Sequence, residues 1–343
     1  MRTELTRLAG CRYPIVQTGM GYVSGPRLVS ATANAGGLGI IASATMSLRE
    51  LGAAVDEVRS STAAPFGVNL RADAADAADR VELIIDKGVK VASFALAPSE
   101  KLMARLRDAG VVVMPSVGAL RHAQKVAAWG AHAVVVQGGE GGGHTGAIPT
   151  SLLVPQIVDA VDIPVVAAGG FFDGRGLVAA LAYGACGIAM GTRFLLTSDS
   201  PVAEEVKRVY LSKTLSDTVV TTRVDGVPHR VLRTSFVDNL GRKGLLYALR
   251  NAARFRKLSG LSWARMLRDG AAMRHARDLG WAQVLMAANT PMLLKAAMVD
   301  GRPDLGVMSS GQVVGVIDDL PTVAELISRI VDEAEATLKR LGA

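Results

Sequence analysis

Short apolar runs recur along this chain as far as residue 190, and longer alanine-rich segments separate them. The runs are rich in Val and Ile and contain almost no polar residue, which is typical of strands buried on both faces, as in parallel sheets. The segments between them have helical spacing, and several end at glycine, the usual residue just past a helix. Eight runs carry this pattern, at 15–20, 38–42, 66–70, 89–94, 111–116, 133–137, 164–168 and 187–190.

Eight strands that alternate with helices predict parallel strands joined by right-handed crossovers, and eight such units can close into a barrel. The alternative is an open doubly wound sheet, which places its main glycine-rich loop after the first strand. Here the densest glycine-rich loops follow the sixth, seventh and eighth runs. We therefore predict an α/β fold, a (β/α)8 TIM barrel with a mainly helical C-terminal extension.

The chain has 343 residues, more than the ~250 that one such barrel needs. The alternation stops after Thr197. The later segments are helical at 204–211, β-prone at 219–231 with a turn at Asp225-Gly226, largely helical at 240–298 and amphipathic at 322–340. We predict a barrel over residues 1–235, closed by the helix at 322–340, and a basic helical extension or lid over 236–320.

Composition narrows the class of protein. No stretch approaches ~18 consecutive apolar residues, so no membrane span is expected. The first twenty residues have no apolar core of a secretory signal. The two cysteines, Cys11 and Cys186, do not make a disulfide framework. These features favour a cytoplasmic protein.

The strongest local motif follows the sixth predicted strand, where six of the nine residues from Gly138 to Gly146 are glycine. Bare backbone lets N–H groups approach an anion or a planar ring closely. Gln137, at the strand end, can donate and accept hydrogen bonds together. His144 lies in the loop, and histidine is the side chain that most readily changes charge near neutral pH. The alternative is a flexible loop with a solvated histidine.

Two further loops favour a phosphate site. Gly169 and Gly170 follow the seventh strand, and Met190, Gly191 and Thr192 follow or end the eighth. In TIM barrels these two loops, with the N-terminus of a short helix, often bind phosphate. Plain tight turns are the alternative for either loop alone.

The first and third strands also end in residues suited to a ring. Gly19 allows close backbone approach, Met20 can pack on a ring face, and the amide of Asn69 can bond to a ring edge. Since the carboxyl ends of parallel strands meet at one mouth, these groups predict a phosphate-tailed redox cofactor such as a flavin, beside one histidine.

At these residues the sequence resembles the nitronate monooxygenase (2-nitropropane dioxygenase) family, which includes the flavin-dependent bacterial enoyl-acyl-carrier-protein reductases. The resemblance covers roughly residues 10 to 235 and implies the same barrel, holding FMN. It is carried by the ordered motifs at 14–17, 36–39, 67–69, 137–146, 168–170 and 190–194.

The resemblance also implies roles for individual residues. His144 corresponds to the histidine proposed in the family to act on substrate as acid or base. The residues it places on the cofactor are Gly19 and Met20 (backbone contact to the ring), Asn69 and Gln137 (polar partners), Met190, and Gly142, Gly143, Gly169, Gly170, Gly191 and Thr192 (phosphate cradle).

A basic segment departs from the compact nitronate enzymes. Ten Lys and Arg lie between Arg242 and Arg277, against the single acid Asp269. The chain is similar here to an actinobacterial branch acting on coenzyme A thioesters in steroid ring degradation. Arginine binds phosphate by bidentate, charge-assisted bonds, so Arg254 and Arg256 are expected to bind the CoA phosphates. A solvated helix face and a nucleic-acid arm are the alternatives; the interleaved apolar residues disfavour the second.

We therefore predict an FMN-dependent oxidoreductase that exchanges a hydride at the Cα–Cβ bond of an acyl-CoA thioester, such as a steroid (cholesterol) ring-degradation intermediate. The alternatives are a nitronate monooxygenase that oxidises alkyl nitronates with O2, and a flavin-binding protein without turnover. NAD(P)H is a candidate electron partner, a homodimer a candidate assembly, and no nucleic-acid partner is expected. The five histidines lack zinc-like spacing with cysteines or carboxylates, so no metal site is predicted.

Overall fold

The structure is a computed structural model, and it describes residues 1–95, 98–240 and 292–342. Its centre is one parallel sheet in the order β5-β4-β3-β2-β1-β10-β9-β7-β6. The strands are β1 (Ile15–Gln17), β2 (Leu38–Ala42), β3 (Phe66–Arg71), β4 (Val91–Ala95), β5 (Val112–Val113), β6 (Ser116–Val117), β7 (Val134–Gln137), β9 (Val165–Ala168) and β10 (Gly187–Met190). Each strand overlaps one of the apolar runs that were predicted from the sequence to form strands.

The two ends of this sheet belong to one chain segment. β5 and β6 are separated only by Met114 and Pro115. The Met114 N–H donates to Ala92 O beside β4 (2.8 Å), and the Val135 N–H of β7 donates to Pro115 O (2.9 Å). Because Pro115 has no N–H, it interrupts the ladder inside an otherwise continuous strand. The sheet is thereby closed with eight strand positions, which confirms the predicted TIM barrel.

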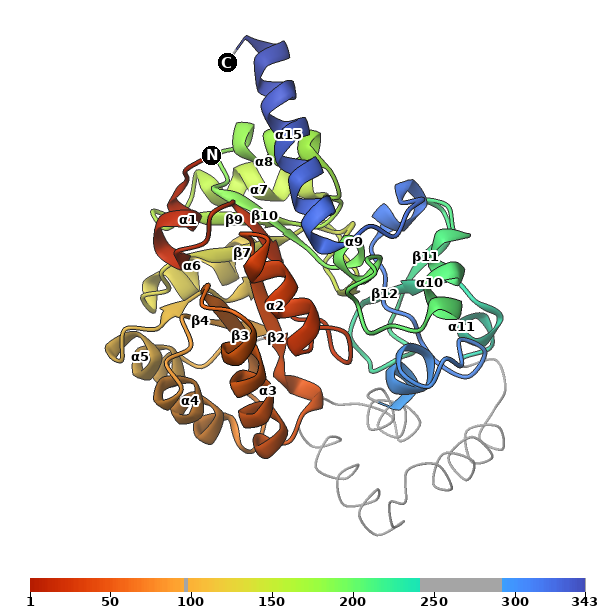
Figure 1. The fold of residues 1–343 in the computed structure, drawn as a ribbon, viewed down its shortest axis with the longest axis horizontal. Coiled ribbons are helices and arrows are strands. Elements are labelled where there is room, and N and C mark those ends of the chain that lie inside the picture. The colour runs from red at the N-terminus through yellow and green to blue at the C-terminus, as the bar shows by residue number, and fades with distance from the viewer. Residues whose placement is uncertain (96–97, 241–291, 343) are drawn as a thin grey trace.

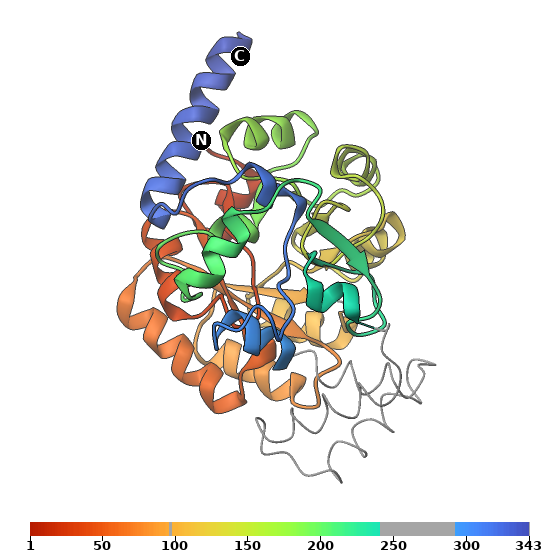
Figure 2. The ribbon, with the colours of Figure 1, turned by 90° about the vertical axis from the view of Figure 1, so that its right-hand side faces the viewer.

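Helices follow the strands and cover the outside of the barrel (Figures 1 and 2). They begin where the sequence supplies caps: Pro26 is the first residue of α2, and Ser47 with Glu50 forms a capping box at α3. Several end at a left-handed glycine, such as Gly110 or Gly184. They are α2 (Pro26–Asn34), α3 (Leu48–Ser61), α4 (Ala77–Asp86), α5 (Glu100–Asp108), α6 (Leu120–Ala128), α7 (Thr150–Val158), α8 (Gly174–Ala182) and the short α9 (Thr192–Leu195).

The barrel interior is a separate apolar cluster of inward-facing strand residues, among them Val16, Ile40, Val135 and Val166. A short N-terminal helix, α1 (Glu4–Ala9), adds Leu5 and Ala9 to the same cluster. The side chain of Leu5 lies beside Gly187, at the first residue of β10. This end of the barrel is therefore packed with apolar side chains, and helix α1 was not anticipated from the sequence.

A second unit, here called the cap (residues 200–240 and 292–321), lies at one end of the barrel. It is on the right in Figure 1 and faces the viewer in Figure 2. A three-stranded antiparallel sheet joins it to the barrel in the order β11-β12-β8, and β8 comes from the glycine-rich loop after β7. The cap contains α10 (Glu204–Leu211), β11 (Thr218–Thr221), β12 (His229–Leu232), α11 (Ser235–Asn239) and η2 (Gln312–Val316), and β8 spans Gly143–His144.

The last helix, α15 (Val323–Leu341), returns to the barrel and packs on α8 and α2. Thr322 and Glu325 form its capping box, and its apolar face supplies Leu326, Ile327 and Ile330 to the core. The amphipathic helix expected at 322–340 is present. In the described part of the chain no helix is both long and apolar enough to cross a membrane. The division at residue 235 stays a prediction, and the segment at 241–291 lies outside the described residues.

Replacement of Gly174 by alanine is expected to lower the free energy of unfolding by about 1–3 kcal/mol. A Cβ atom there would lie 2.4 Å from the backbone N of Ala334 and from the backbone O of Ile330, so α15 must move away from α8. Gly52→Ala is the control, because a Cβ in helix α3 would meet its nearest neighbour at 3.5 Å. Urea unfolding should show a loss for Gly174→Ala only; equal midpoints would contradict this account of the contact.

Candidate active site

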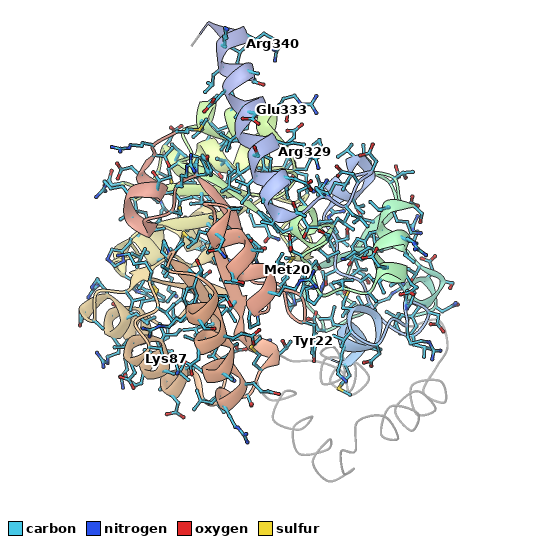
Figure 3. The ribbon with its side chains drawn as sticks, in the orientation of Figure 1. Met20, Tyr22, Lys87, Arg329, Glu333 and Arg340 are labelled. Carbon is cyan, nitrogen blue, oxygen red and sulfur yellow. The ribbon has the colours of Figure 1, made fainter. Side chains whose placement is uncertain are left out.

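The ends of the first, third and eighth strand positions meet at the cap side of the barrel. A Cβ on Gly19 would lie 2.7 Å from Cβ of Asn69, so only glycine allows this approach. Gly191 lies beside Met20, whose sulfur would be 3.4 Å from a Cβ there. Figure 3 labels Met20 on the side of the barrel that faces the cap. The structure thus brings together Gly19, Met20, Asn69 and Gly191.

Buried polar side chains hold the loop after β1. The amide of Gln17 donates to Ser24 Oγ (2.8 Å), and Ser24 Oγ accepts from the Met20 N–H (2.9 Å) while donating to Thr18 O (2.9 Å). The other amide atom of Gln17, Oε1, is buried and has no partner among the described residues. Tyr22, in the same loop, has a φ of 63°, which is unusual for a residue other than glycine. The backbone at Met20 is therefore held in a defined position.

The glycine-rich loop is held by hydrogen bonds along its length. The amide of Gln137 donates to Gly142 O (3.2 Å) and to His144 O (2.9 Å), so its N–H groups are used in hydrogen bonds within the loop. The carboxylate of Glu140 accepts from the N–H of Thr150 (2.9 Å) at the start of α7. Arg230 of β12 donates to Gly139 O (2.8 Å). The loop is therefore held in a defined conformation, and it connects the barrel with the cap.

The glycines predicted to hold a phosphate lie beside one another. A Cβ on Gly142 would be 2.5 Å from the N atom of Gly311, a cap residue, and the Gly311 N–H donates to Thr192 Oγ1 (2.9 Å). Gly169 and Gly170 have φ values of 98° and 82°, which favour glycine. Gly311 is a cap residue at this place that the sequence did not single out.

The residues present fit a phosphorylated flavin. Among the described residues, Gly170 makes no hydrogen bond through its N–H, which leaves a donor at the predicted phosphate cradle. A Cβ on Gly143, beside His144, would meet nothing within 4 Å, so the backbone there borders open space. The predicted cradle offers an N–H donor for a phosphate group. The open space at Gly143 and the polar residues at the ends of β1 and β3 offer room and hydrogen-bond partners for a flat ring.

One expected cofactor residue is oriented differently. The side chains of β10 alternate, so Ala189 faces the barrel interior while Met190 packs in the layer between strands and helices. Met190 contributes its carbonyl at the mouth, and this accepts from the Thr18 N–H (3.1 Å). Its side chain therefore points away from the site. Arg254 and Arg256, the expected CoA contacts, lie outside the described residues.

His144 is paired with a carboxylate from the cap. Its Nε2 lies 2.6 Å from Asp225 Oδ2, and its side chain is one-third exposed (33%) while that of Asp225 is 11% exposed. The ring of His229 lies beside that of His144, with 4.7 Å between the centroids. The antiparallel register of β8 and β12, which sets His144 opposite His229, causes this arrangement. The sequence places Asp225 in a turn but gives no local sign that this residue or His229 lies beside His144.

The electrostatics of this cluster follow from burial and pairing. Burial alone would raise the pKa of Asp225, but the hydrogen bond from His144 and the nearby ring of His229 outweigh it and hold the pKa well below its usual range. Burial lowers the pKa of His229, so its ring is neutral near pH 7. The pKa of Arg71, at the end of β3, is raised first by its bonds to Asp73 and also by Asp225. Asp225 is therefore an ionised carboxylate among cationic and neutral neighbours.

The same cluster has the composition of a metal site, contrary to the expectation from sequence spacing. Ligating atoms of His144, Asp225 and His229 lie within 4.8 Å of one another. Two ligands about 2.0–2.1 Å from a tetrahedral ion are roughly 3.3 Å apart. The 2.6 Å between His144 and Asp225 is instead the length of a direct, charge-assisted hydrogen bond. The geometry therefore favours hydrogen bonding over metal ligation.

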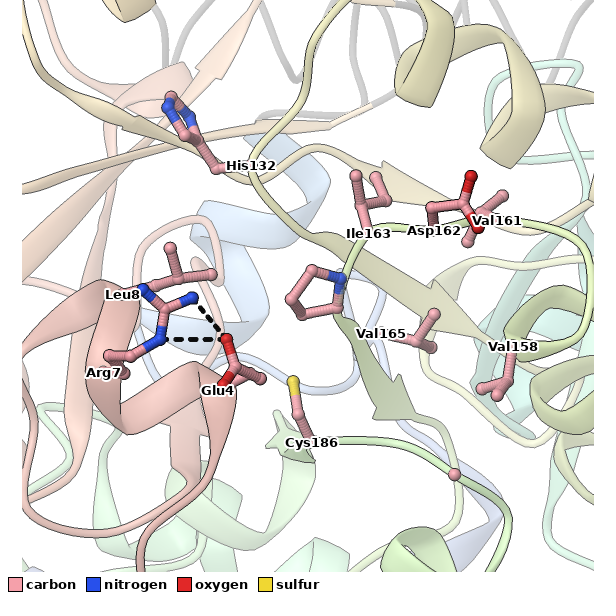
Figure 4. A pocket seen from close by; sticks show the side chains of 12 residues that line it. Glu4, Arg7, Leu8, His132, Val158, Val161, Asp162, Ile163, Val165 and Cys186 are labelled. Carbon is pink, nitrogen blue, oxygen red and sulfur yellow. Dashed lines mark hydrogen bonds and ion pairs between the residues drawn. The ribbon is translucent and has the colours of Figure 1, made fainter.

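A hollow of about 470 Å³ lies at the opposite end of the barrel (Figure 4). Pro164 and Cys186, which precede β9 and β10, line it, as does the hydrogen-bonded pair Glu4 and Arg7 of helix α1. Burial raises the pKa of Cys186 to about 11, so its thiol is protonated near neutral pH. The hollow is thus remote from His144 and has no reactive thiolate.

Known proteins are similar to this chain along its whole length. A protein of Mycobacterium tuberculosis, "(3aS,4S,5R,7aS)-5-hydroxy-7a-methyl-1-oxo-octahydro-1H-indene-4-carboxyl-CoA dehydrogenase", is 63% identical over 350 residues, covering 100% of this chain and 99% of the relative. A protein of Rhodococcus jostii with the same name is 58% identical over 347 residues, covering 100% of this chain and 98% of that relative. The structure of FabK from Thermotoga maritima superposes with a TM-score of 0.82 at 34% identity, covering 99% of this chain and 98% of FabK.

The sequence pattern of the family described as nitronate monooxygenase matches residues 2–333, almost the whole chain. The matched range includes the motifs singled out in the sequence between residues 14 and 194, and the barrel that holds them is the one observed. The chain is therefore a flavin-dependent oxidoreductase that belongs to the nitronate monooxygenase family.

Proposed function

We propose that this protein is an FMN enzyme that removes hydrogen across the Cα–Cβ bond of an acyl-CoA thioester, with an octahydroindene-carboxyl-CoA as the substrate class. The observation that carries the proposal is the place of His144, which is partly exposed, paired with Asp225 and adjacent to the open space at Gly143. The names of the two relatives support both the substrate class and the direction.

A bound flavin supplies a two-electron acceptor for a hydride. The protein's part is to position the thioester and to take one proton. In the proposed reaction the carbon beside the thioester carbonyl loses a proton to His144, and its neighbour loses a hydride to the flavin. A carbon–carbon double bond forms, and the two hydrogens are accounted for as one proton and one hydride. A base held at hydrogen-bonding distance contributes about 10²- to 10⁴-fold to such a step.

FMN is the favoured flavin because the glycine cradle is suited to one terminal phosphate. Gly142, Gly169, Gly170, Gly191 and Thr192 are the residues proposed to bind it, and Gly19, Met20, Asn69 and Gln137 those proposed to contact the ring. The bonds of the Gln137 amide to Gly142 and His144 leave its carbonyl oxygen as the atom for a ligand. NAD(P)H as the electron partner stays a prediction, as does phosphate binding by Arg254 and Arg256.

The decisive experiment mixes the purified yellow protein, without oxygen, with 5-hydroxy-7a-methyl-1-oxo-octahydroindene-4-carboxyl-CoA or with its analogue lacking the 5-hydroxyl. We expect both to bleach the visible flavin band, because the proposed reaction does not use the hydroxyl. The product should keep the 5-hydroxyl, where the substrate has one, and gain a double bond between C3a and C4, read by mass and NMR. A C4–C5 double bond beside the hydroxyl would instead be the enol of a 5-ketone.

Other outcomes identify the alternatives. Bleaching by the hydroxylated thioester alone, with a 5-ketone as product, would assign the chemistry to the hydroxyl. Oxygen-dependent consumption of propyl nitronate at a higher kcat/KM than that of either thioester would favour the nitronate monooxygenase reaction. A flavin that no thioester or nitronate reduces would indicate binding without turnover.

A further inference from the structure

We propose that Asp225 is a positioning residue that holds His144 with its proton on Nε2, so that Nδ1 is the atom that exchanges the substrate proton. This inference rests on the proposed function for its chemical meaning, and on the contact geometry together with the ionised carboxylate of Asp225 for the state of the ring. Neither the proposed reaction nor the family match specifies which nitrogen of His144 reacts.

The direction of the hydrogen bond between His144 and Asp225 follows from the charge of the carboxylate. An ionised carboxylate only accepts hydrogen bonds, and Asp225 is ionised near neutral pH. The 2.6 Å contact between His144 Nε2 and Asp225 Oδ2 therefore requires a proton on Nε2. A neutral imidazole carries one N–H, so its Nδ1 is then left with a lone pair. Nδ1 has no hydrogen-bond partner among the described residues, and the side chain is partly exposed.

The carboxylate of Asp225 is itself held in place. Its other oxygen, Oδ1, accepts the Val227 N–H at 3.2 Å in the turn before β12. His229 closes the far side: its Nδ1 faces Asp225 Oδ2 at 3.9 Å, and its Nε2 lies 2.8 Å from Ser309 Oγ. His229 Nδ1 is buried without a hydrogen-bond partner in the described structure, and the carboxylate is the polar group that faces it.

An amide in place of the carboxylate is expected to reverse the direction of this hydrogen bond. In Asp225→Asn the Val227 N–H still needs an acceptor, which places the amide oxygen at the position of Oδ1. The amide nitrogen then occupies the position of Oδ2 and donates to His144 Nε2. The ring proton moves to Nδ1, and the proposed reacting atom loses its lone pair. The substitution is isosteric, so it changes the ring's tautomer with little change of shape.

The test measures the ring directly. In the flavin-loaded protein labelled with 15N-histidine, long-range 15N–1H correlation spectra should show neutral His144 protonated on Nε2, assigned by its absence in His144→Gln. Asp225→Asn should show the proton on Nδ1. Its kcat with the CoA thioester should fall about 10²- to 10⁴-fold, while KM and bound flavin stay near those of the wild type. Asp225→Glu should recover part of kcat because it restores a carboxylate.

Asp217→Asn is the matched control. Asp217 is a partly exposed aspartate of the same cap that accepts bonds from Thr214, and its replacement should leave both tautomer and kcat unchanged. A proton on Nδ1 of His144 in the wild-type protein would overturn the proposal, and this measurement does not depend on a variant. The finding of one zinc or iron ion per chain, lost in Asp225→Asn, would also overturn it. Inversion of the tautomer in a protein that turns over no thioester would contradict the proposed function alone.

Discussion

Replacement of His144 by glutamine is expected to lower the turnover of a CoA thioester by about 10²- to 10⁴-fold, the usual contribution of a general acid or base. Glutamine keeps much of the size of the ring and its polarity, but it cannot take a proton near neutral pH. The flavin should remain bound, because the predicted cradle at Gly169, Gly170 and Gly191 is built from other loops. Anaerobic stopped-flow spectroscopy of flavin bleaching measures the loss in the chemical step itself.

His122→Gln is the control for this experiment, because His122 is an exposed histidine on helix α6. It should bleach at the wild-type rate. If His144→Gln also bleaches at that rate with its flavin content intact, His144 takes no part in the chemistry. If His144→Gln is purified colourless, the residue acts in holding the cofactor rather than in moving a proton.

The second large effect is expected at Asp319, where alanine should lower the free energy of unfolding by about 3 kcal/mol. Arg193, which follows the predicted phosphate loop, is buried, and its Nη1 donates to Asp319 Oδ1 at 2.8 Å. The other oxygen of Asp319 accepts from Arg329 of α15 at 2.6 Å. Removing the carboxylate leaves a buried guanidinium charge without its counter-ion, and this is more costly than losing the contact alone.

Asp304→Ala is the matched control, since Asp304 is paired with Arg302 on the surface. Exposed pairs contribute about 0–1 kcal/mol, so its unfolding midpoint should hardly move. Urea unfolding of both variants, with saturating flavin, measures the difference. Equal midpoints would mean that water or the Leu196 and Asp319 carbonyls, which also accept from Arg193, satisfy the guanidinium without the carboxylate.

Several features of the molecule were predictable because they depend on neighbouring residues in the chain. Buried parallel strands need continuous apolar runs, so the strand at 187–190 could be assigned from its own composition. Helix caps are equally local, as at Ser47 and Thr322. The glycine loop after β7 was recognisable because backbone freedom and closeness to a strand end are both visible in one window of sequence.

The tertiary structure alone decided which side chains meet. Asp225 lies 81 positions from His144, and the turn that contains it has no local sign of a partner, because the contact exists only once β12 pairs with β8. Gly311 reaches Thr192 across 119 positions for the same reason. The outward direction of the Met190 side chain depends on how β10 is placed between its neighbouring strands, and the sequence of β10 alone does not show this. Local composition determined the barrel and the glycines at its mouth; the pairing of strands distant in sequence determined the surroundings of the histidine.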